Sequence, residues 1–180
     1  MKNWIALLRG INVSGQKIIR MQDLRDLCEK IGLYEVETYI QSGNIVFRSE
    51  ISNRRELESR IAEAIQVHYG FEVPVWVITT EEITFYLQHD PFGDDEKYDP
   101  KRRFYCLLDK LPDPDGLIAL WDLAEEPEVV AVVDRMVYLY IPGNAARTKL
   151  SNNMVEKLLK CKATTRNQNT LQALLLLGGA

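Results

Sequence analysis

The first half of the chain alternates short apolar runs with amphipathic segments, in the order strand, helix, strand, strand, helix, strand. Apolar residues recur at helical spacing over residues 21–31 and 53–68, where Gly32 provides a stop signal and Asn53 a start signal. The tetrapeptide Gln-Ser-Gly-Asn at 41–44 separates the two central strands and predicts a tight hairpin. The predicted strands are residues 4–9, 36–40, 45–48 and 73–78.

The second half repeats this order with different residues. A short connecting helix over 79–89 and an irregular acidic loop over 90–101 come first. Apolar helix faces follow at 117–124, 154–159 and 171–175, and a turn at Asp134 and Arg135 predicts a second hairpin. The predicted strands are residues 104–109, 129–133, 137–141 and a very short one at 163–165.

Two successive β-α-β-β-α-β units predict a mixed α/β (α+β) fold made of two tandem ferredoxin-like plaits. Each plait should be a four-stranded antiparallel sheet with strand order 4-1-3-2 and its helices on one face. The two halves share negligible identity, so the repeat concerns only the order of elements. We assign the first lobe to residues 1–79, a connecting helix and acidic loop to 80–102, and the second lobe to 103–180.

In this topology the loop after the first strand and the first hairpin lie at the same end of the sheet. Loop 10–17 contains two glycines, which allow backbone amides to approach a ligand closely. The loop also leads toward a helix start, where anions are favoured. The alternative is that the glycines serve turns only and that the cation ending the strand is an ordinary surface charge. The candidate ligand-binding residues here are Arg9, Asn12, Lys17, Gln41, Ser42 and Asn44.

In the second half, loops 142–149 and 164–169 follow the third and fourth strands and run directly into helices. Two helix starts with unpaired amides should therefore converge, together with several cations, on a site suited to phosphate or carboxylate. The alternative is that the polar residues serve only as helix N-caps, which is their more frequent role. The candidate ligand-binding residues here are Arg147, Lys149, Asn152, Thr165, Arg166 and Asn167.

Composition excludes several protein classes. A hydrophobic content of 46% is ample for a packed core, and the net charge of −4 argues against a protein held to nucleic acid by bulk charge. Residues 81–128 carry 14 acidic and five basic side chains, whereas residues 135–180 carry one and seven. This asymmetry indicates either complementary surfaces or a solvated acidic loop. No apolar run approaches membrane-spanning length, and the three separated cysteines indicate a reducing, cytoplasmic location.

Signals for known chemistry are missing. The chain has no phosphate-binding or dinucleotide-binding glycine motif and no nucleophile elbow. Its two histidines lie on separate predicted helices, so we expect no metal site and no cofactor. Aromatic residues on strands resemble the base-stacking residues of RNA-binding plaits, but packing in the core is the commoner role. Whether the protein is an enzyme stays open.

Four strings carry a family resemblance. They are ALLRGINVSG at 6–15, TYIQSGNIVF at 38–47, TKLSN at 148–152 and ATTRNQNT at 163–170. Together they resemble the bacterial family called domain of unknown function 1697, over essentially the whole chain. The resemblance implies a cytoplasmic α/β protein of two plait-like halves, with no established reaction or cofactor. Family members often have Trp where this chain has Gln168, so a stacking surface at that position would be altered here.

The four strings coincide with the loops that the topology places at sheet ends, which favours a ligand site over plain capping. We therefore expect a protein that binds an anionic small molecule or nucleotide. Two alternatives remain: a nucleic-acid-binding plait module, and a protein-interaction domain that self-associates through its acidic middle and basic end. We expect no membrane partner, and the sequence determines neither the ligand nor the oligomeric state.

Overall fold

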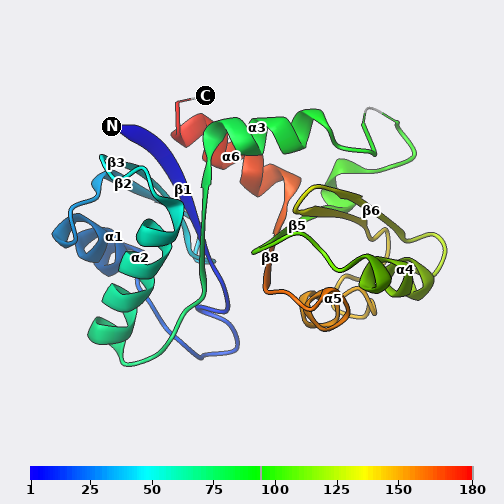
Figure 1. Cartoon of the computed structure of the whole chain (residues 1–180), viewed down its shortest axis with the longest axis horizontal. Coiled ribbons are helices and arrows are strands. Elements are labelled where there is room, and N and C mark those ends of the chain that lie inside the picture. The colour runs from blue at the N-terminus through cyan, green and yellow to red at the C-terminus, as the bar shows by residue number, and fades with distance from the viewer. Residues whose placement is uncertain (94, 180) are drawn as a thin grey trace. The chain divides into compact units, whose positions relative to one another are not determined.

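The computed structural model describes residues 1–93 and 95–179 and contains two four-stranded antiparallel sheets (Figure 1). The chain divides into two compact units, whose boundaries fall inside two helices. Unit 1 comprises Met1–Thr84 and Gln172–Ala180, and unit 2 comprises Phe85–Leu171. In each unit, two helices cover one face of the sheet (Figure 1). The predicted fold of two tandem plaits is confirmed.

Unit 1 follows the predicted order. Its elements are β1 (Lys2–Leu8), α1 (Met21–Lys30), β2 (Tyr34–Tyr39), β3 (Asn44–Ser49), α2 (Arg54–Tyr69) and β4 (Val75–Thr79). The strands are arranged β2-β3-β1-β4, and all neighbours are antiparallel. Leu7 pairs with Asn44, so the end of β1 meets the start of β3. The loop after β1 and the hairpin between β2 and β3 therefore lie at one end of the sheet.

The core of unit 1 combines the two periodicities seen in the sequence. Trp4, Ala6 and Leu8 point from β1 to the helix-covered face, where they pack with buried residues of both helices, including Leu24 and Ile61. Burial of each large aliphatic side chain contributes about 1.5–3 kcal/mol.

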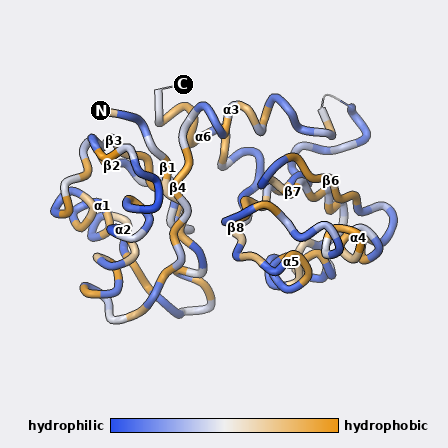
Figure 2. The backbone as a smooth tube through the Cα atoms, viewed as in Figure 1, coloured by the Kyte–Doolittle hydropathy of each residue, from blue (hydrophilic) through white to orange (hydrophobic). Residues whose placement is uncertain are grey.

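Unit 2 contains the second plait. The helix α3 (Thr80–Gln88) begins in unit 1 and ends in unit 2. It is followed by η1 (Pro100–Arg102), β5 (Arg103–Leu108), α4 (Pro114–Leu123), β6 (Val129–Val133), β7 (Met136–Tyr140), α5 (Asn152–Leu159), β8 (Ala163–Asn167) and α6 (Gln168–Leu177). The strands are arranged β6-β7-β5-β8, which repeats the order of the first sheet. The hairpin of β6 and β7 is hydrophobic along most of its length (Figure 2).

Two boundaries differ from the sequence expectation. Strand β8 extends to Asn167 because it pairs with β5 through Tyr105↔Arg166 and Phe104↔Asn167. Arg166 and Asn167, expected in a loop, therefore belong to an edge strand. The compact units also differ from the expected ranges 1–79, 80–102 and 103–180, because the last nine residues group with the first plait and residues 85–102 with the second.

Candidate functional site

Asn12 organises the loop that follows β1. Its side-chain Nδ2 donates to the carbonyl oxygens of Ile19 (2.9 Å) and Gln41 (2.8 Å), and its Oδ1 accepts from the amide of Ile19 (2.8 Å). The residue has a φ of 54°, in the left-handed region that Asn tolerates better than most residues. The loop therefore touches the first hairpin, as the topology predicts, and Asn12 is the side chain that joins them.

The first hairpin packs tightly against the same loop. Asn44 is fully buried, and its Nδ2 donates to the carbonyl of Tyr39 (3.0 Å) and to the hydroxyl of Ser42 (2.9 Å). Gly43 has a φ of 76°, and a Cβ there would lie 2.6 Å from the Leu8 Cβ. Glycine is thus required both by the backbone conformation and by the space. Asn44 holds the turn together and faces the interior.

The remaining candidates of unit 1 divide into anchored and exposed residues. The Lys17 ammonium donates to the carbonyl of Glu72 (2.6 Å), which ties the loop to the segment before β4. Arg9 is half-buried at the end of β1, and its amide donates to the carbonyl of Pro74 (3.0 Å). The side chains of Gln41 and Ser42 are exposed at the rim. Of the six candidates, Asn12 and Lys17 therefore brace the loop, and Asn44 braces the hairpin.

We expect Asn12→Ala to lower the free energy of unfolding by about 2–3 kcal/mol. The change removes three hydrogen bonds and leaves Ala in a left-handed conformation. Urea unfolding measures the loss. Asn12→Gly relieves only the backbone strain and should recover about 1 kcal/mol, and Gln16→Ala in the same loop should be neutral. A loss below about 0.5 kcal/mol in Asn12→Ala would contradict this bracing role.

In unit 2, Asn152 and Thr165 form a polar contact on the helix-covered face of the sheet. Asn152 opens α5 and donates from Nδ2 to the carbonyl of Ala163 (3.1 Å). Its Oδ1 accepts from the Thr165 hydroxyl (2.8 Å), and the Cys106 thiol lies 3.8 Å from the same oxygen. These contacts fasten α5 to β8, so both side chains serve the packing of helix on sheet.

Arg166 lies on the opposite face of this sheet, because successive strand residues point to opposite sides. It is the cross-strand partner of Tyr105, and its Nη1 donates to the Thr164 hydroxyl (3.0 Å) and the Thr165 carbonyl (2.9 Å). Burial lowers the pKa of its guanidinium to about 10. The group is therefore charged at neutral pH but poorly solvated.

The sequence predicts that Arg166 meets the starts of two helices, and the sheet geometry does not bring these three together. The beginning of α5 lies on the helix-covered face, whereas Arg166 lies on the other. Asn167 caps α6, since its Oδ1 accepts from the amide of Thr170 (2.9 Å). Lys149 pairs with Glu125 at the surface, and Arg147 is exposed in the loop after β7. Among the candidate residues of unit 2, Arg166 is the cation whose side chain is partly buried, whereas Arg147 and Lys149 are exposed.

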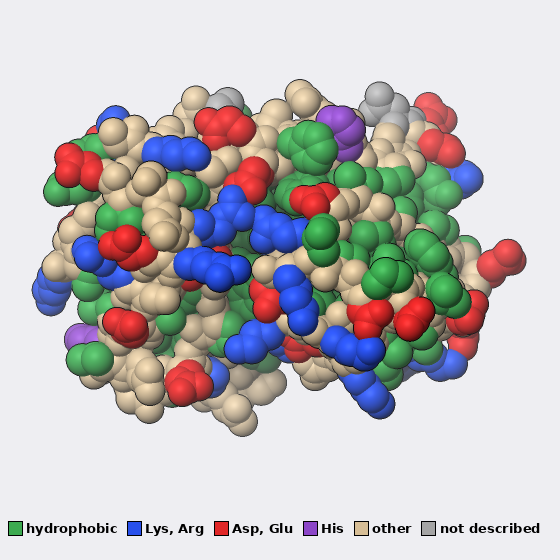
Figure 3. Space-filling view, in the orientation of Figure 1, with side chains coloured by type: hydrophobic (Ala, Val, Ile, Leu, Met, Phe, Trp, Pro, Cys, Tyr) green, Lys and Arg blue, Asp and Glu red, His purple; other side chains and the backbone are tan. Residues whose placement is uncertain are grey.

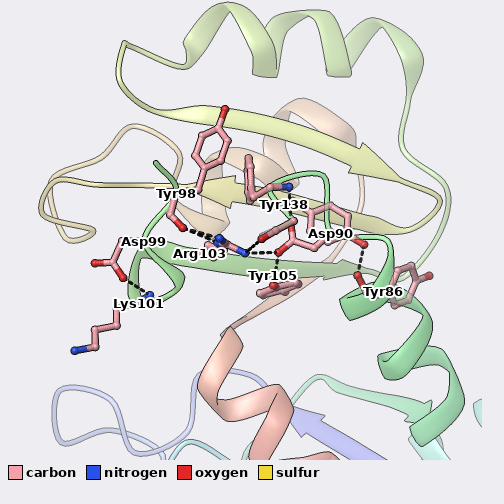
Figure 4. A network of polar contacts seen from close by, with 10 residues as sticks. Tyr86, Asp90, Tyr98, Asp99, Lys101, Arg103, Tyr105 and Tyr138 are labelled. Atoms are coloured by element: carbon pink, nitrogen blue, oxygen red, sulfur yellow. Dashed lines mark hydrogen bonds and ion pairs between the residues drawn. The ribbon is translucent and has the colours of Figure 1, made fainter. Parts of the chain in front are cut away.

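Sequence reasoning missed a buried polar network in unit 2 (Figure 4). Asp90 and Arg103 form an ion pair (Oδ2 to Nη1, 3.3 Å) in which both side chains are only 5% exposed. Tyr105 donates from its hydroxyl to the same carboxylate oxygen (2.7 Å). Arg103 also donates to the carbonyls of Gly93 (2.7 Å) and Tyr98 (2.6 Å). The network fastens Asp90, at the start of the acidic segment, to the strand β5, whereas Asp95, Glu96 and Asp99 of that segment are exposed.

Two further tyrosines extend this network. Tyr138 donates to the carbonyl of Tyr86 (2.8 Å), and Tyr86 donates to the Asp134 carboxylate (3.0 Å). Burial is the main reason why the pKa values of Tyr105 and Tyr138 lie well above the ordinary value. Both phenols are therefore protonated donors at neutral pH, and their rings, which are at most 2% exposed, are not available to stack on a base.

A weak signal for the network exists in the sequence. Arg103 immediately precedes the predicted strand 104–109, and the structure begins β5 one residue earlier, so that Arg103 and Tyr105 share a face, which is an unusual place for a cation. The partner, Asp90, is one acid among several in a segment with no periodicity, so the pairing becomes visible only in three dimensions.

Gln168, where the resemblance noted above leads us to expect Trp, is also partly buried. The Oε1 atom of Gln168, the first residue of α6, is shielded from solvent and accepts no hydrogen bond from the residues that the structure describes.

Across residues 1–93 and 95–179, no group of three His, Cys, Asp or Glu side chains is placed to hold a metal ion. Within those residues, no helix combines the length and the hydropathy that crossing a membrane requires.

Comparison with known proteins relates this architecture to one family. The chain is similar over 98% of its length, and over 98% of the other chain, to the solved structure of the conserved bacterial protein SP0830 from Streptococcus pneumoniae. The two share 26% sequence identity, with a TM-score of 0.71. A comparison with curated proteins found no match. The profile described as "Protein of unknown function (DUF1697)" matches residues 1–138, and the chain therefore belongs to this family.

Proposed function

We propose that this protein binds a small molecule through an oxyanion, phosphate or carboxylate, which Arg166 of β8 receives. The observation that carries the proposal is the placement of this guanidinium. It lies on a sheet face in poorly solvated surroundings that lower its pKa to about 10, and two neutral oxygens fix its orientation.

Such a guanidinium suits anion binding for two reasons. Removing water from a charge strengthens its interaction with an opposite charge, because less solvent screens the pair. The planar fork, already oriented by the Thr164 hydroxyl and the Thr165 carbonyl, loses little conformational freedom when it binds two oxygens of one ligand. The exposed Lys149, whose charge is matched by Glu125, lacks both advantages.

Polar residues in the other sequence strings of the family resemblance have structural roles that are compatible with this proposal. Asn12 and Asn44 brace the first loop and hairpin of unit 1, and Asn152 fastens α5 to β8, the strand that carries Arg166 on its other face. The buried rings of Tyr105 and Tyr138 give no support to the alternative of a base-stacking nucleic-acid module.

Inorganic phosphate and citrate are suitable probes, because they separate the two oxyanion classes. We expect one of them to raise the melting temperature of the wild-type chain beyond a sodium chloride control of equal ionic strength. Arg166→Met should weaken that binding by about 10- to 100-fold, since it removes charge-assisted hydrogen bonds. Lys157→Met, which removes an exposed cation from α5, should leave binding unchanged.

Two further readouts distinguish binding from a structural role. Without ligand, Arg166→Met should stay folded and melt close to the wild-type temperature, because Met keeps the apolar stem of the side chain in place. Ligand affinity should be constant near neutral pH and fall as the pH rises through about 10, where the guanidinium loses its proton. Equal stabilisation by both probes and by sodium chloride, together with a lower melting temperature of Arg166→Met, would show a structural cation instead.

A further inference from the structure

The outer edges of the two sheets are protected to very different degrees. An edge strand exposes unpaired backbone groups, and proteins usually block it with charges, bulges, proline or a covering element. Edge strand β2 carries Glu35 and Glu37 and an irregular register against β3. Edge strand β4 follows Pro74, and the Glu58 side chain of α2 accepts from the amide of Val77 (3.0 Å).

The edge strands of unit 2 contrast with one another. On β8, the Glu156 side chain of α5 accepts from the amide of Ala163 (2.8 Å), and Arg166 places a charge on the strand. Strand β6 has the sequence VVAVV, without a charge, a proline or a bulge, and pairs with β7 over all five residues in regular register. Each of its residues is partly exposed, and no strand pairs with its outer edge among the described residues. Of the four described edges, β6 is the one left open.

The backbone groups that β6 presents outward can be identified from its hairpin. Asp134 and Arg135 form a two-residue turn, so the flanking residues Val133 and Met136 face each other. In such hairpins the flanking residues form a hydrogen-bonded pair, and bonded and non-bonded pairs then alternate along the ladder. Val130 and Val132 therefore direct their N–H and C=O groups away from β7. Ala131, between them, bonds to β7.

We propose that β6 is a self-association surface, on which a second copy of this chain adds its own β6 antiparallel, about a two-fold axis at Ala131. Val130 of each copy then lies opposite Val132 of the other, which makes four backbone hydrogen bonds. The sheet of unit 2 becomes a continuous eight-stranded sheet. This inference concerns assembly and is independent of the proposed anion site.

The strand and its surroundings favour a second copy as the occupant. An antiparallel pair of identical strands is self-complementary, as a two-fold interface requires. Ala131 would face its own copy in a non-hydrogen-bonded pair, where the strands approach most closely and a small side chain fits. Hydrophobic side chains gather over α4, beside β6 (Figure 3). Ile118 and Trp121 of this helix are 57% and 48% exposed, and the two-fold axis places both α4 helices on the same sheet face, where these side chains add apolar contact area.

Salt dependence separates this interface from association between the acidic middle and the basic end of the chain. In the proposed register Glu128 of each copy lies near Asp134 of the other, so like charges face each other at both ends of the strand pair. Added salt screens this repulsion and should leave the dimer unchanged or strengthen it. Association between oppositely charged segments would weaken instead.

Sedimentation equilibrium of the full chain tests the proposal. We expect a monomer–dimer equilibrium for the wild type that sodium chloride does not weaken. Ala131→Lys places two like charges opposite each other and should raise the dimer dissociation constant at least about tenfold. Ala131→Val, the matched apolar control, should keep the dimer.

Val132→Pro provides a second variant, because it removes one outward N–H while leaving the hydrogen bonds between β6 and β7 in place. It should also raise the dissociation constant, and circular dichroism establishes that each variant is folded. A wild type that stays monomeric at about 0.1 mM would overturn the proposal. Folded Ala131→Lys and Val132→Pro variants that dimerise like the wild type would also overturn it, as would a dimer that salt dissociates.

Discussion

Asp90→Ala is expected to lower the free energy of unfolding of unit 2 by about 3–5 kcal/mol, because it leaves the buried cation of Arg103 without its anion. The carboxylate also accepts from the Tyr105 hydroxyl and the amide of Phe92, so three donors lose their acceptor together. Both side chains of the ion pair are only 5% exposed, so water cannot readily hydrate the Arg103 guanidinium once the carboxylate is removed. Urea unfolding, followed by the fluorescence of Trp121 in the same unit, measures the effect.

Three variants make this test specific to the network. Glu96→Ala removes an exposed carboxylate from the same segment and should change stability by less than about 0.5 kcal/mol. Tyr105→Phe removes one hydrogen bond and should cost about 1 kcal/mol. Asp90→Asn keeps the acceptor oxygen but not the charge, so its loss should fall between those of Tyr105→Phe and Asp90→Ala. If Asp90→Ala costs no more than Glu96→Ala, Asp90 does not hold the segment to the sheet.

Gly116→Ala is expected to destabilise unit 2 by about 2–4 kcal/mol, although Ala is intrinsically the better helix former by about 1 kcal/mol. Gly116 lies in α4, where a Cβ would be 2.2 Å from the carbonyl oxygen of Leu158 and 2.9 Å from its carbonyl carbon. Both atoms belong to the backbone of α5, which cannot turn aside as a side chain can. The two helices would have to separate and disturb the core around Leu120, Val155 and Leu159.

The measurement decides whether Gly116→Ala raises or lowers the free energy of unfolding of unit 2. Gly143→Ala is the matched control, because a Cβ there meets nothing within 4 Å and the backbone is not left-handed. It should be neutral or stabilise by up to about 1 kcal/mol, since Ala restricts the unfolded chain more than Gly. A stabilising Gly116→Ala would mean that α4 and α5 do not pack as closely as described.

The pattern of apolar positions was sufficient to predict the fold of each unit. Period-two runs and helical spacing gave the order of elements, and the order of strands followed from the plait topology, because few ways exist to bury one face of four strands under two helices. The hairpin turns and the cap at Asn53 were also local features, and the Asn53 side chain accepts from the amides of Arg55 and Glu56 as expected. The contact between the loop after β1 and the first hairpin followed from the same topology.

The role of individual polar residues was decided by tertiary structure. Asn12 and Asn44 are of a residue type that often binds ligands, yet their side chains form hydrogen bonds with backbone groups of neighbouring turns. Arg166 and Thr165 are adjacent in sequence, but the extension of β8 by pairing with β5 places them on opposite faces of the sheet. Two extra residue pairs at the end of β8 thus separate a candidate site into two.

By itself, the sequence determined which segments are strands and helices and how they connect, because those choices depend on neighbours a few residues away. It could not determine that Asp90 meets Arg103, that Glu58 and Glu156 block two sheet edges, or that β6 is left open. Those outcomes depend on which distant groups the fold brings within about 3 Å of one another, where water is displaced and a hydrogen bond or a charge becomes decisive.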